Sequence, residues 1–336
     1  MRWFGSNKSN DTERSPGGKL SLPAFVARNI ASIADLDGPH FVFLVTFTNG
    51  DQMVLKAEMS VNSSQTVSSH NIGVRVMGLV SPVKAVTLTD AEKAQVGIVD
   101  TGISSAFFKA EQAIAAGNAH WVKAVFQTGL AGLKDAGSFQ VKAEGSMFGD
   151  DDPQKKIAAT AYMAKLNRQL AGNSKAWKSL GAIVAVDMLL GNQDRISLHN
   201  AGFDNLPNVQ FRQNGNKITE AVGLDTYDSL HTGTSDLHDI SIDDWKTNCG
   251  EYLKDLNKAE TQIGAAMNDG IRQINKTFGT GTCTWGTKEK KAFAEGYKSS
   301  AAKLKTKMKA EAPKLMKLGG SAPKGLLLRL NWLGWL

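Results

Sequence analysis

The sequence predicts an α+β protein of two lobes, the first rich in β-strands and the second mainly helical. In the first part of the chain, runs of β-branched and aromatic residues alternate with turn signals. In the second part, apolar residues recur at helical spacing over longer segments. The 336 residues, of which 42% are apolar, suffice for one large or two medium hydrophobic cores.

The first lobe is predicted to follow a polar leader. Residues 1–20 are rich in Gly, Ser, Asn and charged residues, and we expect them to be disordered. The lobe then covers residues 21–128. His40–Thr48 is a predicted strand, Asn49-Gly50 a two-residue hairpin turn, and Asp51–Glu58 the return strand. The sequence therefore predicts a β-hairpin near the start of this lobe.

Further elements complete the first lobe. Ser63–Gly78 has helical potential, and Pro82–Leu88 and Trp121–Gln127 are predicted strands. An amphipathic stretch that contains Glu111 lies between these two strands. The turn signal of Gly129 follows the second strand, so we place the boundary between the lobes there.

The second lobe is predicted to cover residues 129–320 and to be followed by an apolar tail, residues 321–336. Gln154–Leu170 is a predicted helix, and three Asp residues before it favour its N-terminus through the helix dipole. Lys175–Leu190 is a second helix with an apolar stripe, and we expect it to be largely buried. Asn173 or Ser174 can cap its start, and Gly191-Asn192 can end it.

The most informative segment follows this second helix. Gly191-Asn192-Gln193-Asp194-Arg195 is followed, fourteen residues after Asp194, by Asn208, and Asp225 comes seventeen residues later. Val209–Arg212 and Ile218–Leu224 are predicted hairpin strands, so Asn208 and Asp225 flank the hairpin. A loop Asp can accept a hydroxyl proton, and a downstream Asn and Asp can hold the Mg²⁺ that neutralises ATP phosphates. An Asp-Arg pair alone would be ascribed to a loop salt bridge, but the spacing favours phosphoryl transfer.

The segments LGAIVAVDMLLGNQDRISLHNAGFDNLPNVQF and AVGLDTYDS resemble the catalytic core of the actin-fragmin kinase family. This family belongs to the atypical protein kinases related to phosphatidylinositol 3/4-kinases. The resemblance implies a bilobal protein-kinase-like fold that binds ATP with Mg²⁺ or Mn²⁺. Asp194 then corresponds to the catalytic Asp, and Asn208 and Asp225 to the metal ligands.

The sequence departs from the family pattern at one position. The Gly that precedes the metal-binding Asn in the family is Pro207 here. Asn200 and Asn205 therefore compete with Asn208 for the role of metal ligand. The role of Arg195 is also open, since it can stabilise either the loop or the transferred phosphate.

A kinase also needs a strand Lys that contacts the ATP phosphates. Lys56, in the run Val-Leu-Lys-Ala-Glu of the return strand, is the candidate. Ser63–Gly78 contains no acidic residue to pair with it, so we rank Glu111 above Glu58 as its partner. The predicted turn Ile33–Pro39 would cover the phosphates, although it lacks G-x-G-x-x-G spacing.

The adenine would be bound where the two lobes join. The segment from Gln127 to Gly129 resembles the inter-lobe hinge of a kinase, in which backbone amide and carbonyl groups bind the base. A strand that simply ends in a Gly turn is the alternative.

We therefore expect an ATP- and Mg-dependent kinase. By resemblance its acceptor is a protein Ser or Thr, with a cytoskeletal protein such as actin as a possible target. Phosphoinositide phosphorylation and nucleotidyl transfer onto a protein are alternatives on the same fold. A kinase-shaped binding module without catalysis is a third hypothesis, which Pro207 and the missing acidic partner of Lys56 favour.

Positive charge is concentrated near the C-terminus. Lys288–Lys317 contains ten Lys and three Glu, which accounts for the whole net charge of +7. This predicted helix, with Phe293, Tyr297, Leu304 and Met308 as its apolar stripe, can bind an acidic partner or an anionic membrane surface. Specific nucleic-acid binding is not expected, because no stacking aromatics alternate with the Lys residues.

Cysteine usage and hydropathy bear on the compartment. Cys249 and Cys283 form neither a disulfide framework nor a zinc motif, as expected for a reducing compartment. We find no signal-peptide pattern in Met1–Ser21 and no apolar run long enough to span a bilayer. The expected location is the cytoplasm, or a host cell entered by non-classical secretion, which the Ser/Asn-rich leader suits. The final apolar residues are expected to pack on the second lobe, with membrane anchoring as the alternative.

Overall fold

The computed structural model divides into two compact units, Met1–Thr128 and Gly129–Leu336, which are described separately. The residues described are 2–3, 12–15, 18–21, 25–26, 30–35, 41–48, 52–59, 83–86, 104–117, 119–126, 130–132, 153–203, 208–214, 217–223, 240–278, 285–317 and 321–336. Both strands and helices are present, as predicted for an α+β chain.

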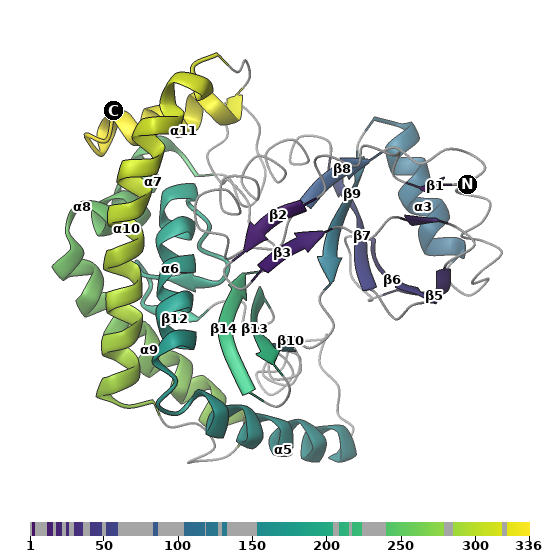
Figure 1. Ribbon diagram of the computed structural model, residues 1–336, viewed down its shortest axis with the longest axis horizontal. Helices are drawn as coiled ribbons and strands as arrows, with labels where there is room; N and C mark the ends of the chain where they lie inside the picture. Colours follow the sequence, from purple (N-terminus) through teal and green to yellow (C-terminus); the bar gives the residue numbers. More distant parts are fainter. Residues whose placement is uncertain are drawn as a thin grey trace. The chain divides into compact units, whose positions relative to one another are not determined.

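The first unit contains an antiparallel sheet of five strands in the order β5-β6-β7-β9-β8 (Figure 1). The strands are β5 (Ile30–Asp35), β6 (Val42–Phe47), β7 (Gln52–Met59), β8 (Val83–Val86) and β9 (Ala119–Phe126). The predicted pairing of the first hairpin is confirmed, with Val42 opposite Lys56 and Thr46 opposite Gln52. The two later predicted strands correspond to β8 and β9.

Strand β5 corrects one prediction. Ile33–Asp35, which we assigned to a turn, pairs with β6, and Ile33 lies opposite Val45. A register shift between Ile30 and Ser32 changes the side-chain alternation, so Ile30 and Ile33 are both buried. The acidic residues of this segment suggested a turn, but burial of the two Ile side chains stabilises a strand. Residues 36–40 lie outside the described part.

Helix α3 (Ser104–Ala115) packs on this sheet. Its Phe107 ring lies 5.7 Å from the ring of Phe43 on β6. Two short antiparallel pairs also belong to this unit: β1 (Arg2–Trp3) with β4 (Phe25–Val26), and β2 (Thr12–Ser15) with β3 (Gly18–Ser21). Disorder of the leader stays a prediction for its other residues, and Ser63–Gly78 lies outside the described residues.

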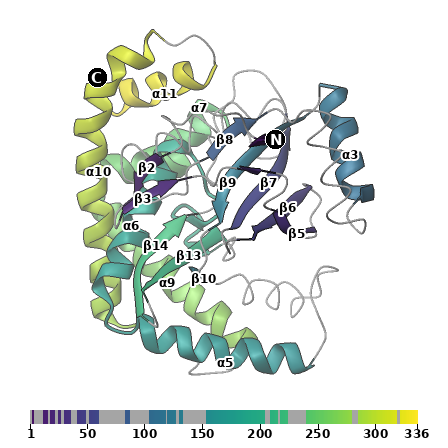
Figure 2. The ribbon, with the colours of Figure 1, turned by 45° about the vertical axis from the view of Figure 1, so that its right-hand side comes forward.

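The core of the second unit is formed by helices α6 (Ser174–Leu190) and α10 (Thr287–Leu315), which lie side by side in both ribbon views (Figures 1 and 2). The predicted helix ending at Leu190 is confirmed, and the Asn173 side chain caps it by accepting from the Ala176 N–H. Residues 180–192 are all buried. A helix that is apolar on all sides is stable only inside a core, which explains this position.

Two glycines allow α6 and α10 to approach closely. A Cβ atom on Gly181 would lie 2.1 Å from the Phe293 carbonyl oxygen, and one on Gly296 would lie 2.0 Å from the Lys178 carbonyl oxygen. The Ser300 hydroxyl adds a hydrogen bond of 3.1 Å to the carbonyl of Ala182. The backbones of the two helices are therefore in direct contact.

A three-stranded antiparallel sheet in the order β10-β13-β14 packs against α6. Its strands are β10 (Leu130–Gly132), β13 (Val209–Asn214) and β14 (Lys217–Gly223). The predicted hairpin is confirmed, whereas β10 was not predicted. The Ala221 N–H donates to Ser179 Oγ at 2.6 Å, and Asn173 Nδ2 donates to the Ile218 carbonyl at 2.9 Å. These bonds tie β14 to α6.

The remaining helices cover the core. They are α5 (Pro153–Leu170), α7 (Ile242–Trp245), the π-helical turn η3 (Lys246–Gly250), α8 (Glu251–Lys254), α9 (Leu256–Phe278) and α11 (Ser321–Trp332). Helix α5 and the apolar stripe of α10 were predicted, and that stripe is buried. The others were not predicted as helices.

The C-terminal tail packs within this unit, as expected. Its Arg329 is fully buried and donates to the Leu189 carbonyl at 3.2 Å. The Trp332 ring lies 5.7 Å from that of Trp245. Within the described residues, no helix combines the length and the apolarity needed to cross a bilayer.

Candidate functional site

The candidate site is the loop that begins where α6 ends. Gly191 has a left-handed backbone with φ of 76°, and its N–H donates to the Asp187 carbonyl. The Asn192 N–H reaches the same carbonyl at 2.9 Å. Glycine adopts this conformation without steric cost, so it ends the helix and turns the chain sharply. The predicted helix stop is therefore observed.

A buried ion pair lies beneath the loop. Arg195 donates from Nε to Asp187 Oδ2 at 2.9 Å and from Nη2 to Asp187 Oδ1 at 2.5 Å. Asn192 Nδ2 donates to Asp187 Oδ1 at 3.2 Å. All three side chains are fully buried. Burial raises the pKa of Asp187, and the charge and hydrogen bonds of Arg195 oppose that rise.

The contacts of Arg195 bear on its role. Its guanidinium group faces Asp187 inside the protein and has no exposed surface. Of the two roles that the sequence left open, these contacts favour stabilisation of the loop. A bidentate pair of this kind fixes orientation as well as distance.

Asp194 and Asn208 are brought together by the fold. The amide nitrogen Nδ2 of Asn208 donates to Asp194 Oδ2 at 2.7 Å. The backbone N–H of Asp194 in turn donates to Asn192 Oδ1 at 3.1 Å. Both Asp194 and Asn208 are partly exposed, in contrast to Arg195. The polar pair therefore lies at the surface of the unit on a loop whose base is buried.

The competing asparagines differ in position. Asn200 is exposed, and its backbone N–H donates to Ser197 Oγ at 3.1 Å. Asn205 lies outside the described residues. Of the described candidates, Asn208 is the one that contacts Asp194.

The end of β14 lies against the same loop. A Cβ atom on Gly223, the last residue of β14, would lie 3.1 Å from Arg195 Cζ. Asp225, the second predicted metal ligand, follows two residues later and lies outside the described residues. The hairpin thus begins next to Asn208, which contacts Asp194, and ends next to Arg195.

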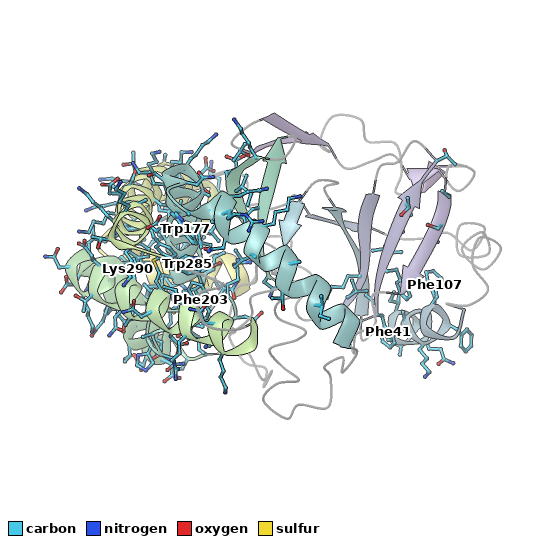
Figure 3. The ribbon with its side chains drawn as sticks, turned by 90° about the horizontal axis from the view of Figure 1, so that it is seen from below. Phe41, Phe107, Trp177, Phe203, Trp285 and Lys290 are labelled. Atoms are coloured by element: carbon cyan, nitrogen blue, oxygen red, sulfur yellow. The ribbon has the colours of Figure 1, made fainter. Side chains whose placement is uncertain are left out.

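Aromatic packing fixes the chain after the loop. β11 (Ile196–Ser197) pairs with β12 (Gly202–Phe203), and Ile196 lies opposite Phe203. The Phe203 ring lies 5.7 Å from that of Trp285, which lies 4.4 Å from the ring of Trp177 on α6 (Figure 3). A Cβ atom on Gly270 of α9 would lie 2.6 Å from Phe203. Both sides of the loop are therefore attached to the core.

The nucleotide-binding candidates of the first unit are partly described. Lys56 lies on β7 and is half-buried, between Leu55 and Ala57, which are 1% and 6% exposed. Strand alternation places Lys56 on the face opposite these two residues. Phe43, the partner of Leu55 in the ladder, contacts α3, the helix that carries Glu111. The pairing of Glu111 with Lys56 stays a prediction.

The hinge candidates Gln127 and Gly129 lie outside the described residues. So does the side chain of Glu58, the second candidate partner of Lys56. Their predicted roles stay predictions.

The donor groups of the loop suit a hard cation. Mg²⁺ prefers oxygen ligands and is commonly bound by one or two carboxylates together with substrate phosphates. Asn208 uses its amide nitrogen for Asp194, so its carbonyl oxygen Oδ1 is the atom that can ligate a cation. In the described part of the chain, no group of three or more His, Cys, Asp or Glu forms a metal cluster. The ligand groups of the loop are therefore suited to a metal ion that takes its other ligands from the phosphate oxygens of a nucleotide.

Sequence reasoning missed Asp187. A signal was available, because it is the one charged residue of the apolar segment 180–190 and precedes Arg195 by eight residues. A buried charge requires a partner, so an ionic contact with a nearby Arg could have been predicted. Pattern reading instead treated Asp187 as part of the helix.

No protein-family model matches the chain, and no curated protein matches it. Among solved structures, the chain is similar to the crystal structure of a Golgi casein kinase with Mn and ADP bound. The TM-score is 0.36, the sequence identity is 11%, and the alignment covers 82% of this chain and 72% of that chain.

Proposed function

We propose that the protein is an ATP- and Mg-dependent phosphotransferase with a bilobal, protein-kinase-like arrangement of its two units. The observation that carries this proposal is the hydrogen bond of 2.7 Å between Asn208 Nδ2 and Asp194 Oδ2. It joins the predicted catalytic Asp to a predicted metal ligand fourteen residues away. The loop that holds them is anchored by a buried ion pair.

The chain's own residues supply positioning and charge. Asp194 would accept or orient the proton of the acceptor hydroxyl, since its carboxylate is partly exposed. Asn208 would hold Asp194 through its amide nitrogen and the metal through its amide oxygen. When bound, the metal neutralises charge on the phosphate oxygens.

Asp225 would supply a carboxylate to the same metal. It follows Gly223 by two residues, and two residues of extended chain span at most about 7 Å. Gly223 itself lies against Arg195, next to Asp194 in the chain. This short reach supports Asp225 as the second metal ligand.

The first unit would bind the rest of the nucleotide. Lys56 would contact the phosphates, and backbone groups between Gln127 and Gly129 would bind the adenine. The place of Lys56 on an inner strand, paired on both sides, supports a fixed position for its side chain.

We propose a protein Ser or Thr as the acceptor, with actin as the first target to test and a host cell as one setting. Lysines on the exposed side of α10, among them Lys303, Lys305 and Lys309, support an acidic partner. An anionic membrane surface is the alternative partner, and a phosphoinositide is the alternative acceptor. Raised salt should weaken either contact, because exposed charges are screened.

The test is label transfer by the full chain. Purified protein is incubated with Mg²⁺ and either γ-labelled or α-labelled ATP, together with actin, with phosphoinositide vesicles, or alone. We expect γ-label on protein, and its loss in Asp194→Asn. Retention of the α-label would show nucleotidyl transfer instead, and γ-label on lipid would identify a lipid kinase.

A thermal-shift measurement separates catalysis from a binding module. Mg-ATP should raise the melting temperature of the wild type and not that of Asp225→Ala. A shift without γ-transfer to any acceptor would favour the binding module. The absence of both would overturn the proposal.

A further inference from the structure

We propose that Asp187 is a positioning residue. It holds the reactive loop through two sets of contacts, one through Asn192 before Asp194 and one through Arg195 after it. This inference rests on the proposed function and extends it to a residue that touches neither nucleotide nor metal. Asp187 is fully buried, one turn before the end of α6.

The first set of contacts passes through Asn192. Asp187 Oδ1 accepts from Asn192 Nδ2 at 3.2 Å, which fixes the orientation of the Asn192 amide. Asn192 Oδ1 then accepts from the backbone N–H of Asp194 at 3.1 Å. The orientation of the Asp187 carboxylate therefore determines, through the Asn192 amide, where the backbone N–H of Asp194 is held.

The second set of contacts passes through Arg195. Its guanidinium group is bound to both Asp187 oxygens, and its backbone follows that of Asp194 directly. The other side of the guanidinium is limited by Gly223, because a Cβ atom there would lie 3.1 Å from Arg195 Cζ. Arg195 thus has little room to move, and both neighbours of Asp194 in this network are fixed by the same carboxylate.

The helix that carries Asp187 is held independently. Trp245 Nε1 donates to the Met188 carbonyl at 2.9 Å, and Arg329 Nη1 donates to the Leu189 carbonyl at 3.2 Å. Two carbonyl groups at the end of α6 therefore keep their partners when Asp187 is changed. Loss of the Asp187 carboxylate should release the loop more than the helix.

Glu289 provides a matched control. It is a second buried carboxylate of the same unit, and it accepts from the backbone N–H groups of Gly172 at 2.7 Å and Gly286 at 2.8 Å. These contacts join the start of α10 to the turn before α6 and do not involve the loop. Glu289→Gln therefore loses a buried charge, as Asp187→Asn does, without changing the support of Asp194.

The experiment compares the two variants in the full chain. Asp187→Asn should lower kcat for γ-phosphate transfer about 100-fold, the size of effect expected from a small displacement of a reacting group. The KM for ATP should change less than about threefold, since the metal and phosphate contacts remain. Glu289→Gln should keep kcat within about threefold of wild type. Equal losses in both variants would overturn the proposal.

A double variant keeps the test valid if Asp187→Asn fails to fold. Asp187→Leu with Arg195→Met replaces both charges by apolar groups, which restores a folded state when a buried ion pair is removed. We expect this variant to unfold cooperatively and to bind Mg-ATP while kcat stays low. Near wild-type kcat would overturn the positioning role.

Hydrogen exchange separates this inference from the proposed function. Amides of residues 192–196 should exchange faster in Asp187→Asn and at the wild-type rate in Glu289→Gln. If the wild type transfers no phosphate, the proposed function fails, and this readout still measures whether Asp187 holds the loop. Unchanged exchange in Asp187→Asn would overturn the inference even in an active enzyme.

Discussion

At the scale of single residues, the proposed function gives the amide group of Asn208 two tasks. Its nitrogen donates to Asp194, and its oxygen is the atom that can reach a cation. A residue that is both ligand and support of the catalytic Asp should affect rate and metal requirement together. Asp225 does not share the first task, because a carboxylate cannot donate a hydrogen bond when ionised.

Asn208→Leu tests this double role, because leucine has a similar size and neither donates nor ligates. We expect the rate of γ-phosphate transfer to fall about 100-fold, within the range known for loss of a positioned acid-base partner. The Mg²⁺ concentration for half-maximal rate should also rise. Both are read from initial rates in a Mg²⁺ titration.

Asn200→Leu is the control for this prediction. Asn200 uses its backbone N–H to contact Ser197, and its side chain is exposed. Its replacement should leave rate and Mg²⁺ requirement near wild type. If Asn200→Leu is inactive and Asn208→Leu is active, the metal ligand has been assigned to the wrong asparagine.

Glu289 gives a prediction for the pH dependence of stability. Burial raises the pKa of Glu289, but the backbone N–H donors of Gly172, Glu289 and Gly286 lower it more, so the net shift is downward. A carboxyl group with a lowered folded-state pKa contributes stability above its unfolded pKa, about 4.5, and that contribution is lost as pH falls.

The difference in unfolding free energy between wild type and Glu289→Gln should follow this sign. We expect about 1.5–3 kcal/mol near pH 7, the usual value for hydrogen bonds to a charged group. The difference should shrink as the pH falls below the unfolded pKa of about 4.5 and then through the lowered pKa of the folded-state carboxyl group. Urea unfolding at several pH values measures it, and a difference that grows on acidification would contradict the assigned contacts.

At the scale of elements, the contact between α6 and α10 determines where the loop lies. The loop continues α6, and the position of α6 against α10 depends on Gly181 and Gly296. Helices approach this closely only where a side chain is absent on each side. The two glycines are therefore structural requirements of the site, although neither is near Asp194 in the chain.

Gly296→Ala should destabilise the protein strongly. The new Cβ atom would lie 2.0 Å from the Lys178 carbonyl oxygen, and backbone atoms cannot move aside as a flexible side chain can. We expect a loss of at least about 3 kcal/mol, the upper part of the range for overpacked cores. Chemical unfolding monitored by circular dichroism would measure it.

Gly264→Ala, in helix α9, is the matched control for this substitution. A Cβ atom on Gly264 would meet no other atom within 4 Å, and glycine is a poor helix former. The same change should therefore stabilise the protein by about 0.5–1 kcal/mol. A similar loss in both variants would contradict the assignment of the Gly296→Ala effect to the close contact between α6 and α10.

At the scale of the whole molecule, the sequence predicted elements whose signals are local. The caps of α6 at Asn173 and Gly191 are short-range patterns, and so are the two hairpins. It did not predict β10, since that strand forms by pairing with β13, which lies far along the chain. It missed β5, whose partner β6 is the next strand, because acidic residues suggested a turn. The ion pair beneath the loop was missed although its signal is local, because Asp187 is the one charged residue of an apolar segment and Arg195 follows eight residues later.

The candidate site likewise has features that the sequence predicted and features that it did not. The spacing of Asp194 and Asn208 was informative because a hairpin and a helix end place both residues, and the structure brings them together. The sequence does not separate Asn200 from Asn208, because both lie in a turn-rich stretch with similar patterns, and the choice of metal ligand between them stays a prediction. The roles of Lys56 and Asp225 depend on how the chain assembles around a ligand, and they remain predictions.

Lys56 tests whether the first unit takes part in nucleotide binding. A ligand that binds only the folded state at 100 times its dissociation constant adds about 2.7 kcal/mol of stability. That corresponds to a rise of several degrees in melting temperature for a protein of this size. Lys56→Met in the full chain removes one positive charge and keeps an unbranched side chain on β7. We expect it to lose most of the Mg-ATP shift while its melting temperature without ligand stays near wild type.

Lys109→Met provides the comparison, since Lys109 is an exposed residue of α3 in the same unit. It removes the same charge from the molecule, so any general electrostatic attraction of ATP weakens equally in both variants. A shift lost in Lys56→Met and kept in Lys109→Met would mean that the phosphates contact a strand residue more than 130 positions before Asp194. Equal shifts in the two variants would exclude Lys56 from the nucleotide site and leave the second unit to bind Mg-ATP without it.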